Sequence, residues 1–168
     1  MCKKPVMMGI YMVLSQQELE MEVFSRFLTN TGYVFRKIEQ HNPPKPDIKC
    51  CRESECCYFE LTDNTPHQTQ KSIHAKKNHV RDAAYFIKPI PDTYKKKFTK
   101  KYEIESCHCY LVIYYTVHPV RELGGHFERE LRIQEEWIRC HIAQSEFQKV
   151  WIYDYHQDRI LSYIEVNT

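Results

Sequence analysis

A run of eight residues at 110–117, YLVIYYTV, most constrains how this chain of 168 residues can fold. Its side chains are apolar or aromatic at both alternating sets of positions. Because successive side chains of a strand point to opposite faces of a sheet, the run predicts a strand that is buried on both faces. A strand of this kind needs helices on both sides of its sheet. The run therefore predicts an α/β (α+β) architecture with a mixed central sheet flanked by helices.

The rest of the chain supplies helices and strands for such a sheet. Ser15 and Glu18 form the signature of a capping box at the start of a helix, and Gly32 is placed to end that helix. Further elements are a strand at 33–39, a hairpin at 48–62, helices at 66–81, 94–102 and 127–142, and strands at 150–155 and 159–164. We expect these elements to form a single domain over residues 1–168.

Composition narrows the class of protein. The chain is 42% hydrophobic and 27% charged, which is typical of a globular protein rather than a disordered one. It has no apolar run of roughly 20 residues, so we expect no membrane span. The lysines and short apolar stretch at the start lack the small-residue cleavage site of a signal peptide. We therefore expect a cytoplasmic protein whose eight cysteines are thiols.

Positive charge is concentrated in residues 71–101. This segment holds ten Lys or Arg and two Asp, whereas the remaining residues hold 14 basic and 20 acidic side chains. A basic segment in an otherwise acidic chain favours a surface that faces a polyanion, with a solvated connector as the alternative. The lysines expected to contact a nucleic-acid backbone are Lys71, Lys76, Lys77, Lys95, Lys96, Lys97, Lys100 and Lys101.

Residues 46–62, PDIKCCRESECCYFELT, are compatible with a zinc knuckle, a redox pair or a hairpin. A hairpin turn centred between Glu53 and Ser54 places residues opposite each other when their numbers sum to 107. One face then carries the apolar set, Ile48, Cys50, Cys57, Phe59 and Leu61. The other face carries Asp47, Lys49, Cys51, Cys56, Tyr58, Glu60 and Thr62. This separation fits a sheet with one buried face, and we expect a loop wider than two residues because Glu-Ser is a poor hairpin pair.

This register decides among the three interpretations. Two cysteines point to each face, so the four cannot bind one zinc ion, and the usual C-x-x-C spacing is absent. Asp47 lies opposite Glu60, with the two side chains a few ångströms apart. Two carboxylates this close need a neutralising partner, and magnesium and similar cations prefer carboxylate and carbonyl oxygens. The hairpin is therefore predicted to carry a metal-binding acid pair.

These features resemble the restriction-endonuclease-like superfamily of PD-(D/E)-x-K nucleases. The family opens this hairpin with Pro-Asp, here Pro46-Asp47, and ends it with an acid, one residue and a lysine, here Glu60-Leu61-Thr62. The resemblance implies metal-dependent hydrolysis of phosphodiester bonds in nucleic acid, DNA rather than RNA, with a homodimer as a possible assembly. It implies magnesium or manganese held by Asp47, Glu60 and the carbonyl of Leu61, with Glu20 of the first helix as a further acid.

The chain departs from the family at Thr62, where the resemblance implies a catalytic lysine. A threonine at this position cannot supply the positive charge of a lysine. Lys71, Gln68 and Gln70 in the following segment are candidate replacements, whereas Lys49 shares the face of the acid pair but lies on its far side. The alternative function is therefore a catalytically inactive module of the same fold that binds nucleic acid or protein.

Overall fold

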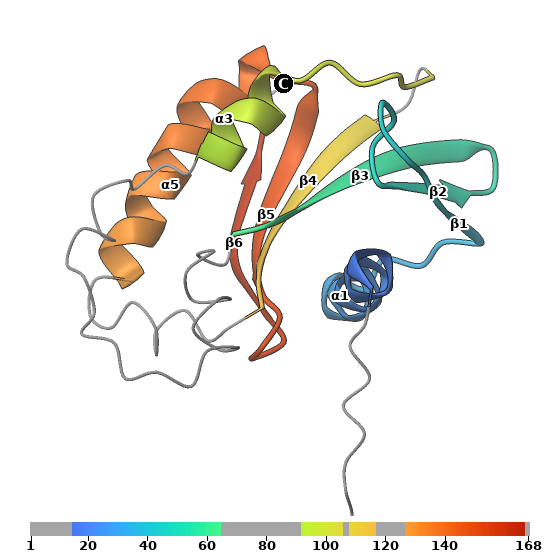
Figure 1. Ribbon diagram of the computed structural model, residues 1–168, viewed down its shortest axis with the longest axis horizontal. Helices are drawn as coiled ribbons and strands as arrows, with labels where there is room; N and C mark the ends of the chain where they lie inside the picture. The colour runs from blue at the N-terminus through green and yellow to red at the C-terminus, as the bar shows by residue number, and fades with distance from the viewer. Residues whose placement is uncertain (1–14, 65–91, 106–107, 117–126, 167–168) are drawn as a thin grey trace, which may run out of the picture.

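The computed structural model describes residues 15–64, 92–105, 108–116 and 127–166, and every structural statement below concerns these residues. They form a mixed α+β structure with a six-stranded sheet flanked by helices (Figure 1). The helices are α1 (Gln16–Thr31), α3 (Asp92–Thr99), α5 (Phe127–His141) and the short 3₁₀ helix η3 (Ile142–Gln144). The strands are β1 (Lys37–Gln40), β2 (Ile48–Arg52), β3 (Glu55–Asp63), β4 (His108–Tyr115), β5 (Phe147–Asp154) and β6 (Arg159–Glu165).

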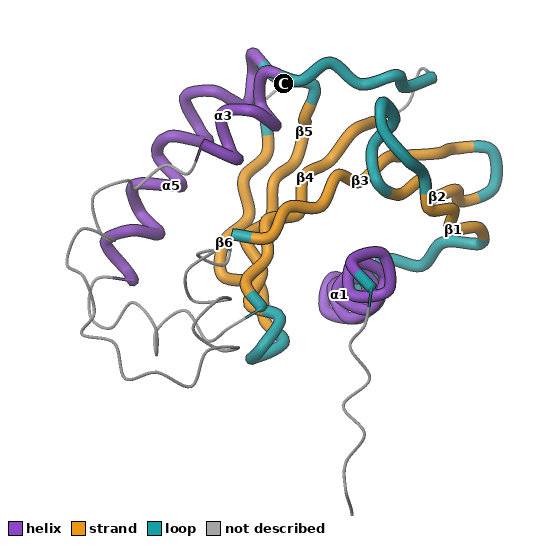
Figure 2. The backbone as a smooth tube through the Cα atoms, in the orientation of Figure 1, coloured by secondary structure: helices purple, strands orange, loops and turns teal. Residues whose placement is uncertain are grey.

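The strands lie in the sheet in the order in which they occur in the chain, from β1 to β6 (Figure 2). β3, β4 and β5 are parallel to one another, and the other neighbouring pairs are antiparallel. β4 has a parallel neighbour on each side and is buried at nearly all its positions. The prediction of a central buried strand within a mixed sheet is therefore confirmed.

Helices cover both faces of the sheet (Figure 1). Phe24 and Phe27 of α1 pack against Phe59 of β3, with ring centroids 4.9 and 6.1 Å away. On the opposite face, Tyr94 and Phe98 of α3 and Ile138 of α5 share a second core with β4 and β5. Because the side chains of β3 alternate between faces, Phe59 and Leu61 belong to the first core, whereas Tyr58 belongs to the second.

The ends of the first helix agree with the prediction, but the next strand does not. Ser15 and Glu18 form the capping box, and Gly32 ends α1 with a φ of 69°. Residues 33–36 are not part of the strand that was expected over 33–39. β1 begins only at Lys37, which pairs with Cys51 one residue before β2 ends. The helix expected at 66–81 lies outside the described residues.

The hairpin has the predicted register, with Ile48 opposite Phe59 and Cys50 opposite Cys57. The expectation of a wide loop is wrong, because the strands are joined by a two-residue turn in which Glu53 adopts a φ of 56°. This positive φ is the conformation that tight hairpin turns require. Glu53 therefore adopts a backbone conformation that residues other than glycine seldom occupy.

The expectation that all the cysteines are thiols is also wrong. Cys51 and Cys56 face each other across the hairpin, with Cα atoms 4.1 Å apart, and form a disulfide. Their direct cross-strand position supplies the proximity that a disulfide needs. Cys50 is a buried thiol, as expected for a core residue. No described helix has both the length and the apolar character needed to cross a bilayer.

Candidate functional site

Asp47 and Glu60 meet where β2 begins beside the longer strand β3. Glu60 is only 1% exposed and lies on the sheet face that α3 covers. The pairing of β2 with β3 ends at Ile48 and Phe59, so β3 continues past the end of its partner. There the Leu61 N–H donates a 2.7 Å hydrogen bond to Oδ2 of Asp47. The Asp47 carboxylate thus takes the place of a strand partner and is fixed beside Glu60.

The pKa of Asp47 reflects both its burial and the nearby charge of Glu60. Burial and then the charge of Glu60 raise the pKa of Asp47 from an ordinary 3.8 to about 6. The hydrogen bond from Leu61 and the positive charge of Lys97 oppose that shift. Asp47 therefore lies in a site where negative charge is concentrated and water is largely excluded. Such a site favours the binding of a cation.

A cation from α3 already reaches this site. The Lys97 ammonium group contacts Oε1 of Glu60, and Nζ of Lys100 lies 3.7 Å from the same oxygen. Lys97 and Lys100 are 25% and 33% exposed, respectively. Both were predicted to face nucleic acid, and in the structure both are directed toward Glu60. Lys97 lies three residues after buried Tyr94, so helical periodicity turns it toward the sheet.

The remaining predicted site residues have weaker connections to Asp47 and Glu60. Thr62 is buried and lies two residues beyond Glu60, on the same sheet face. Glu20 accepts a 2.8 Å hydrogen bond from Gln16, and its charge also raises the pKa of Asp47. Nζ of Lys49 lies 3.4 Å from Oε2 of Glu105, so its ion pair is with that residue. The predicted Lys71, Lys76 and Lys77, with Gln68 and Gln70, lie outside the described residues.

The described residues include no group of three or more His, Cys, Asp or Glu side chains placed to hold one metal ion. Glu20 therefore does not join Asp47 and Glu60 as a third carboxylate ligand. A buried acceptor is nevertheless available, because Oε2 of Glu60 has no hydrogen-bond partner among the described residues. A carboxylate oxygen of this kind fits a hard divalent cation. The Asp47 carboxylate and Oε2 of Glu60 are thus the groups that would hold such a cation, beside the Oε1 that Lys97 contacts.

The tyrosine beside Glu60 reflects the same environment. The Tyr102 hydroxyl is buried and interacts with the Glu60 carboxylate without forming a hydrogen bond of normal geometry. Burial and then the charge of Glu60 raise the pKa of Tyr102 well above its ordinary value. Nζ of Lys100 lies 4.4 Å from the centre of the Tyr102 ring. Tyr102 therefore remains neutral beside Glu60.

The remaining described lysines of the predicted basic surface point outward. Lys95 and Lys96 are exposed on α3. Lys101 follows α3, and its Nζ lies 2.7 Å from Oε1 of Glu146. α3 therefore has two kinds of lysine, one turned toward the acid pair and one available to an external anion.

The chain matches no protein-family model, no curated protein and no solved structure. The function proposed below is therefore inferred from the residues of the site and their geometry.

Proposed function

We propose that this protein is a divalent-metal-dependent nuclease of the restriction-endonuclease-like type, which hydrolyses phosphodiester bonds in nucleic acid, DNA in the first instance. The observation that carries the proposal is the meeting of Asp47, Glu60 and Lys97. Two acids and a lysine are the residue types of the resemblance, and here the lysine comes from α3 rather than from position 62. The order of helix, strand, hairpin, helix and strand agrees with the core of that superfamily.

Three groups of the chain would hold the metal ion, namely the Asp47 carboxylate, Oε2 of Glu60 and the Leu61 carbonyl. The N–H and C=O groups of one strand residue point toward the same side, so the Leu61 carbonyl shares the open edge that its N–H presents to Asp47. A bound magnesium ion would polarise the phosphate and lower the pKa of a coordinated water. Metal binding would also favour ionised Asp47, whose negative charge the protein alone disfavours.

Lys97 supplies the positive charge that Thr62 lacks. Its ammonium group contacts Oε1 of Glu60, which leaves Oε2 of that carboxylate for the cation. A fixed ammonium group in a site poor in water stabilises the negative charge that develops on a phosphate during hydrolysis. Lys97 therefore has the role that the superfamily resemblance assigned to the lysine of the motif.

A second candidate function is a catalytically inactive module that binds nucleic acid or another protein. The contact between Lys97 and Glu60 favours this inactive module, because Lys97 already neutralises Glu60 without a metal ion. In that case the acid pair and Lys97 form a buried structural ion pair, and among the described residues of α3 the exposed Lys95 and Lys96 face a partner.

Cleavage assays separate the two functions. Plasmid and single-stranded DNA are incubated with the protein and magnesium or manganese, and then with Asp47→Asn and Glu60→Gln. The nuclease proposal expects each substitution to lower the rate by at least about 100-fold, because each removes a metal ligand. Glu165→Gln makes the same chemical change at an exposed side chain of β6, the edge strand that β4 and β5 separate from β3. An absence of cleavage with either metal, together with salt-sensitive DNA binding, would favour the inactive module.

A further inference from the structure

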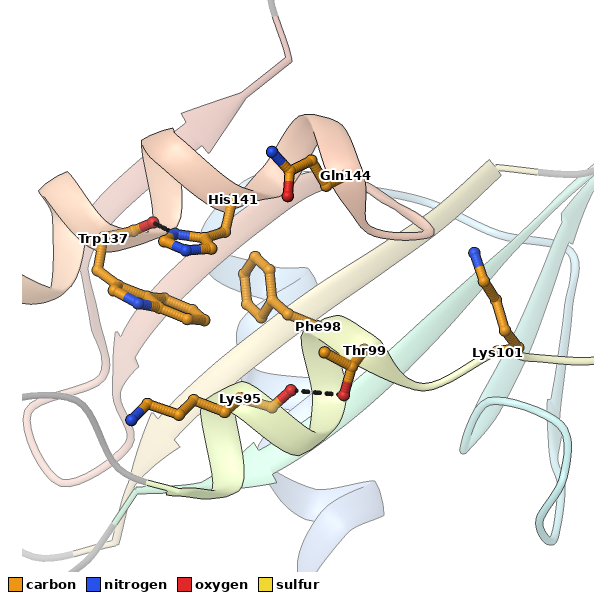
Figure 3. Close-up of a pocket in the computed structure, with 7 residues that line it drawn as sticks. All are labelled: Lys95, Phe98, Thr99, Lys101, Trp137, His141 and Gln144. Atoms are coloured by element: carbon orange, nitrogen blue, oxygen red, sulfur yellow. Dashed lines mark hydrogen bonds between the residues drawn. The ribbon is translucent and has the colours of Figure 1, made fainter.

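α3 also borders a pocket of about 470 Å³ that is separate from the acid pair (Figure 3). Its walls come from α3 and the following Lys101 on one side, and from α5 and η3 on the other. Lys97 and Lys100 do not line this pocket, because they are directed toward Glu60. The residues of α3 therefore divide between two sites that lie on different sides of one short helix.

Two flat rings lie parallel in the wall of this pocket. The centroids of Trp137 and His141 are 4.2 Å apart, with an angle of 15° between the ring planes. Nδ1 of His141 lies 2.7 Å from the Trp137 carbonyl oxygen. Because a carbonyl only accepts, Nδ1 carries the hydrogen, and Nε2 is left to meet a ligand. The ring of Phe98 packs edge-on against the Trp137 indole, with centroids 5.0 Å apart and an angle of 73° between the ring planes. This contact holds the indole in place.

Positive charge lines the same pocket. Lys95 is exposed on α3, and Lys101 lies at the other end of the lining (Figure 3). Lys101 is the exposed partner of its ion pair with Glu146, since the two side chains are 80% and 28% exposed. A surface pair of this kind contributes little free energy, so a phosphate can replace Glu146 as the partner of Lys101. The pocket thus combines an aromatic wall with two accessible cations.

We propose that this pocket binds one nucleotide of a single-stranded nucleic acid. The base packs against the Trp137–His141 pair, and the flanking phosphates lie against Lys95 and Lys101. Aromatic rings and cations are the combination by which proteins hold unpaired strands without reading their sequence. The inference rests on the proposed function only for the choice of nucleic acid as the ligand. In this proposal, α3 lies between the pocket that binds the single-stranded nucleic acid and the acid pair.

The test is a binding measurement without metal, so that cleavage plays no part. A labelled oligo(dT) strand is titrated in EDTA over a range of salt concentrations, and tryptophan fluorescence is followed in parallel. Lys95→Glu should lower the slope of log K against log salt by about 0.7, the value for one phosphate contact on a single strand. Trp137→Leu should weaken binding at least about fivefold, as expected when one base loses its aromatic partner.

Matched variants keep the test independent of folding. Trp137→Phe retains a ring in the core, and it should abolish the fluorescence quenching that oligo(dT) causes, because the other tryptophan, Trp151, is buried. Lys37→Glu reverses a surface charge on β1 and should leave both affinity and quenching unchanged. Wild-type affinity and salt slope in Lys95→Glu, with wild-type quenching in Trp137→Phe, would overturn the pocket assignment even if cleavage is observed. Pocket-dependent binding without any cleavage would support the pocket and overturn the nuclease proposal.

Discussion

The Lys97 ammonium group contacts the Glu60 carboxylate across 37 residues of sequence. This contact joins α3 to the centre of the sheet and gives a buried carboxylate its counter-charge. A buried carboxylate without a cation is costly, and so is a buried lysine without an acid. The pair therefore has a structural role in the fold whether or not a metal ion binds beside it, and experiments on Lys97 must separate stability from catalysis.

Loss of Lys97 should destabilise the protein. We expect Lys97→Met to lower the free energy of unfolding by about 2–3 kcal/mol, because the buried Glu60 charge is then offset only by Lys100, whose Nζ lies 3.7 Å away. Adding Glu60→Gln should recover most of this loss, since the uncompensated charge is then absent. Denaturant unfolding of the wild type, both single variants and the double variant measures the coupling between the two residues. Additive effects, with no coupling, would show that the contact contributes nothing.

The raised pKa of Asp47 predicts a pH dependence of stability. A carboxyl group with a pKa of about 6 in the fold, against an ordinary 3.8, binds more protons in the folded protein than in the unfolded chain. The contribution of Asp47 to stability is therefore greatest below pH 3.8, its ordinary pKa, and is lost as the pH rises through about 6, its pKa in the fold. Asp47→Asn keeps an oxygen for the Leu61 N–H and should remove this decline. Parallel pH profiles of stability for the two proteins would contradict the assignment.

A lysine at position 62 should replace Lys97 in catalysis. If Lys97 supplies the catalytic charge, Lys97→Met should lower the cleavage rate by about 100-fold or more. Thr62 is buried on the same sheet face as Glu60, so Thr62→Lys should restore part of that rate in the Lys97→Met background. The rate of cleavage is compared at equal folded fraction, judged by circular dichroism. Restored stability without restored cleavage would give Lys97 a structural role only.

The hairpin disulfide should be detectable and stabilising. Alkylation of the unfolded, unreduced protein followed by peptide mapping should leave Cys51 and Cys56 unmodified, because they form a disulfide. Replacing both with serine should lower the free energy of unfolding by about 2 kcal/mol, the loop-closure value for so short a loop. The double serine change at the thiols Cys50 and Cys109 probes core packing instead. Complete alkylation of Cys51 and Cys56 before reduction would contradict the disulfide.

Much of the fold could be predicted because it follows from local patterns. The alternation of apolar and polar residues in 46–62 predicted the register that the structure shows from Ile48–Phe59 to Arg52–Glu55. Asp47 lies just beyond this ladder, where its side chain accepts a hydrogen bond from Leu61. The two-residue turn was missed because Glu53 adopts a positive φ that its residue type does not favour. The disulfide was missed because an expected reducing compartment was given more weight than the direct opposition of Cys51 and Cys56.

The contribution of α3 to the site was not predictable from charge alone. Three consecutive lysines at 95–97 have the same chemistry, and only the phase of the helix decides which one turns inward. The signal lay in the spacing, because Lys97 adjoins buried Phe98 and lies one helical turn from buried Tyr94. The partner of that inward face, Glu60, is distant in the sequence and belongs to another element, so no local pattern connects the two.

The most direct measurement of the central claim is a manganese soak of crystals of the protein, with an anomalous difference map. The metal-site account predicts one peak within bonding distance of both the Asp47 and Glu60 carboxylates, which is lost in Glu60→Gln crystals. It also predicts that Lys97 keeps its place beside Oε1 of Glu60 or shifts to make room for the ion. Manganese bound elsewhere, with the acid pair still closed by Lys97 alone, would contradict the account and leave the ion pair as a feature of the fold.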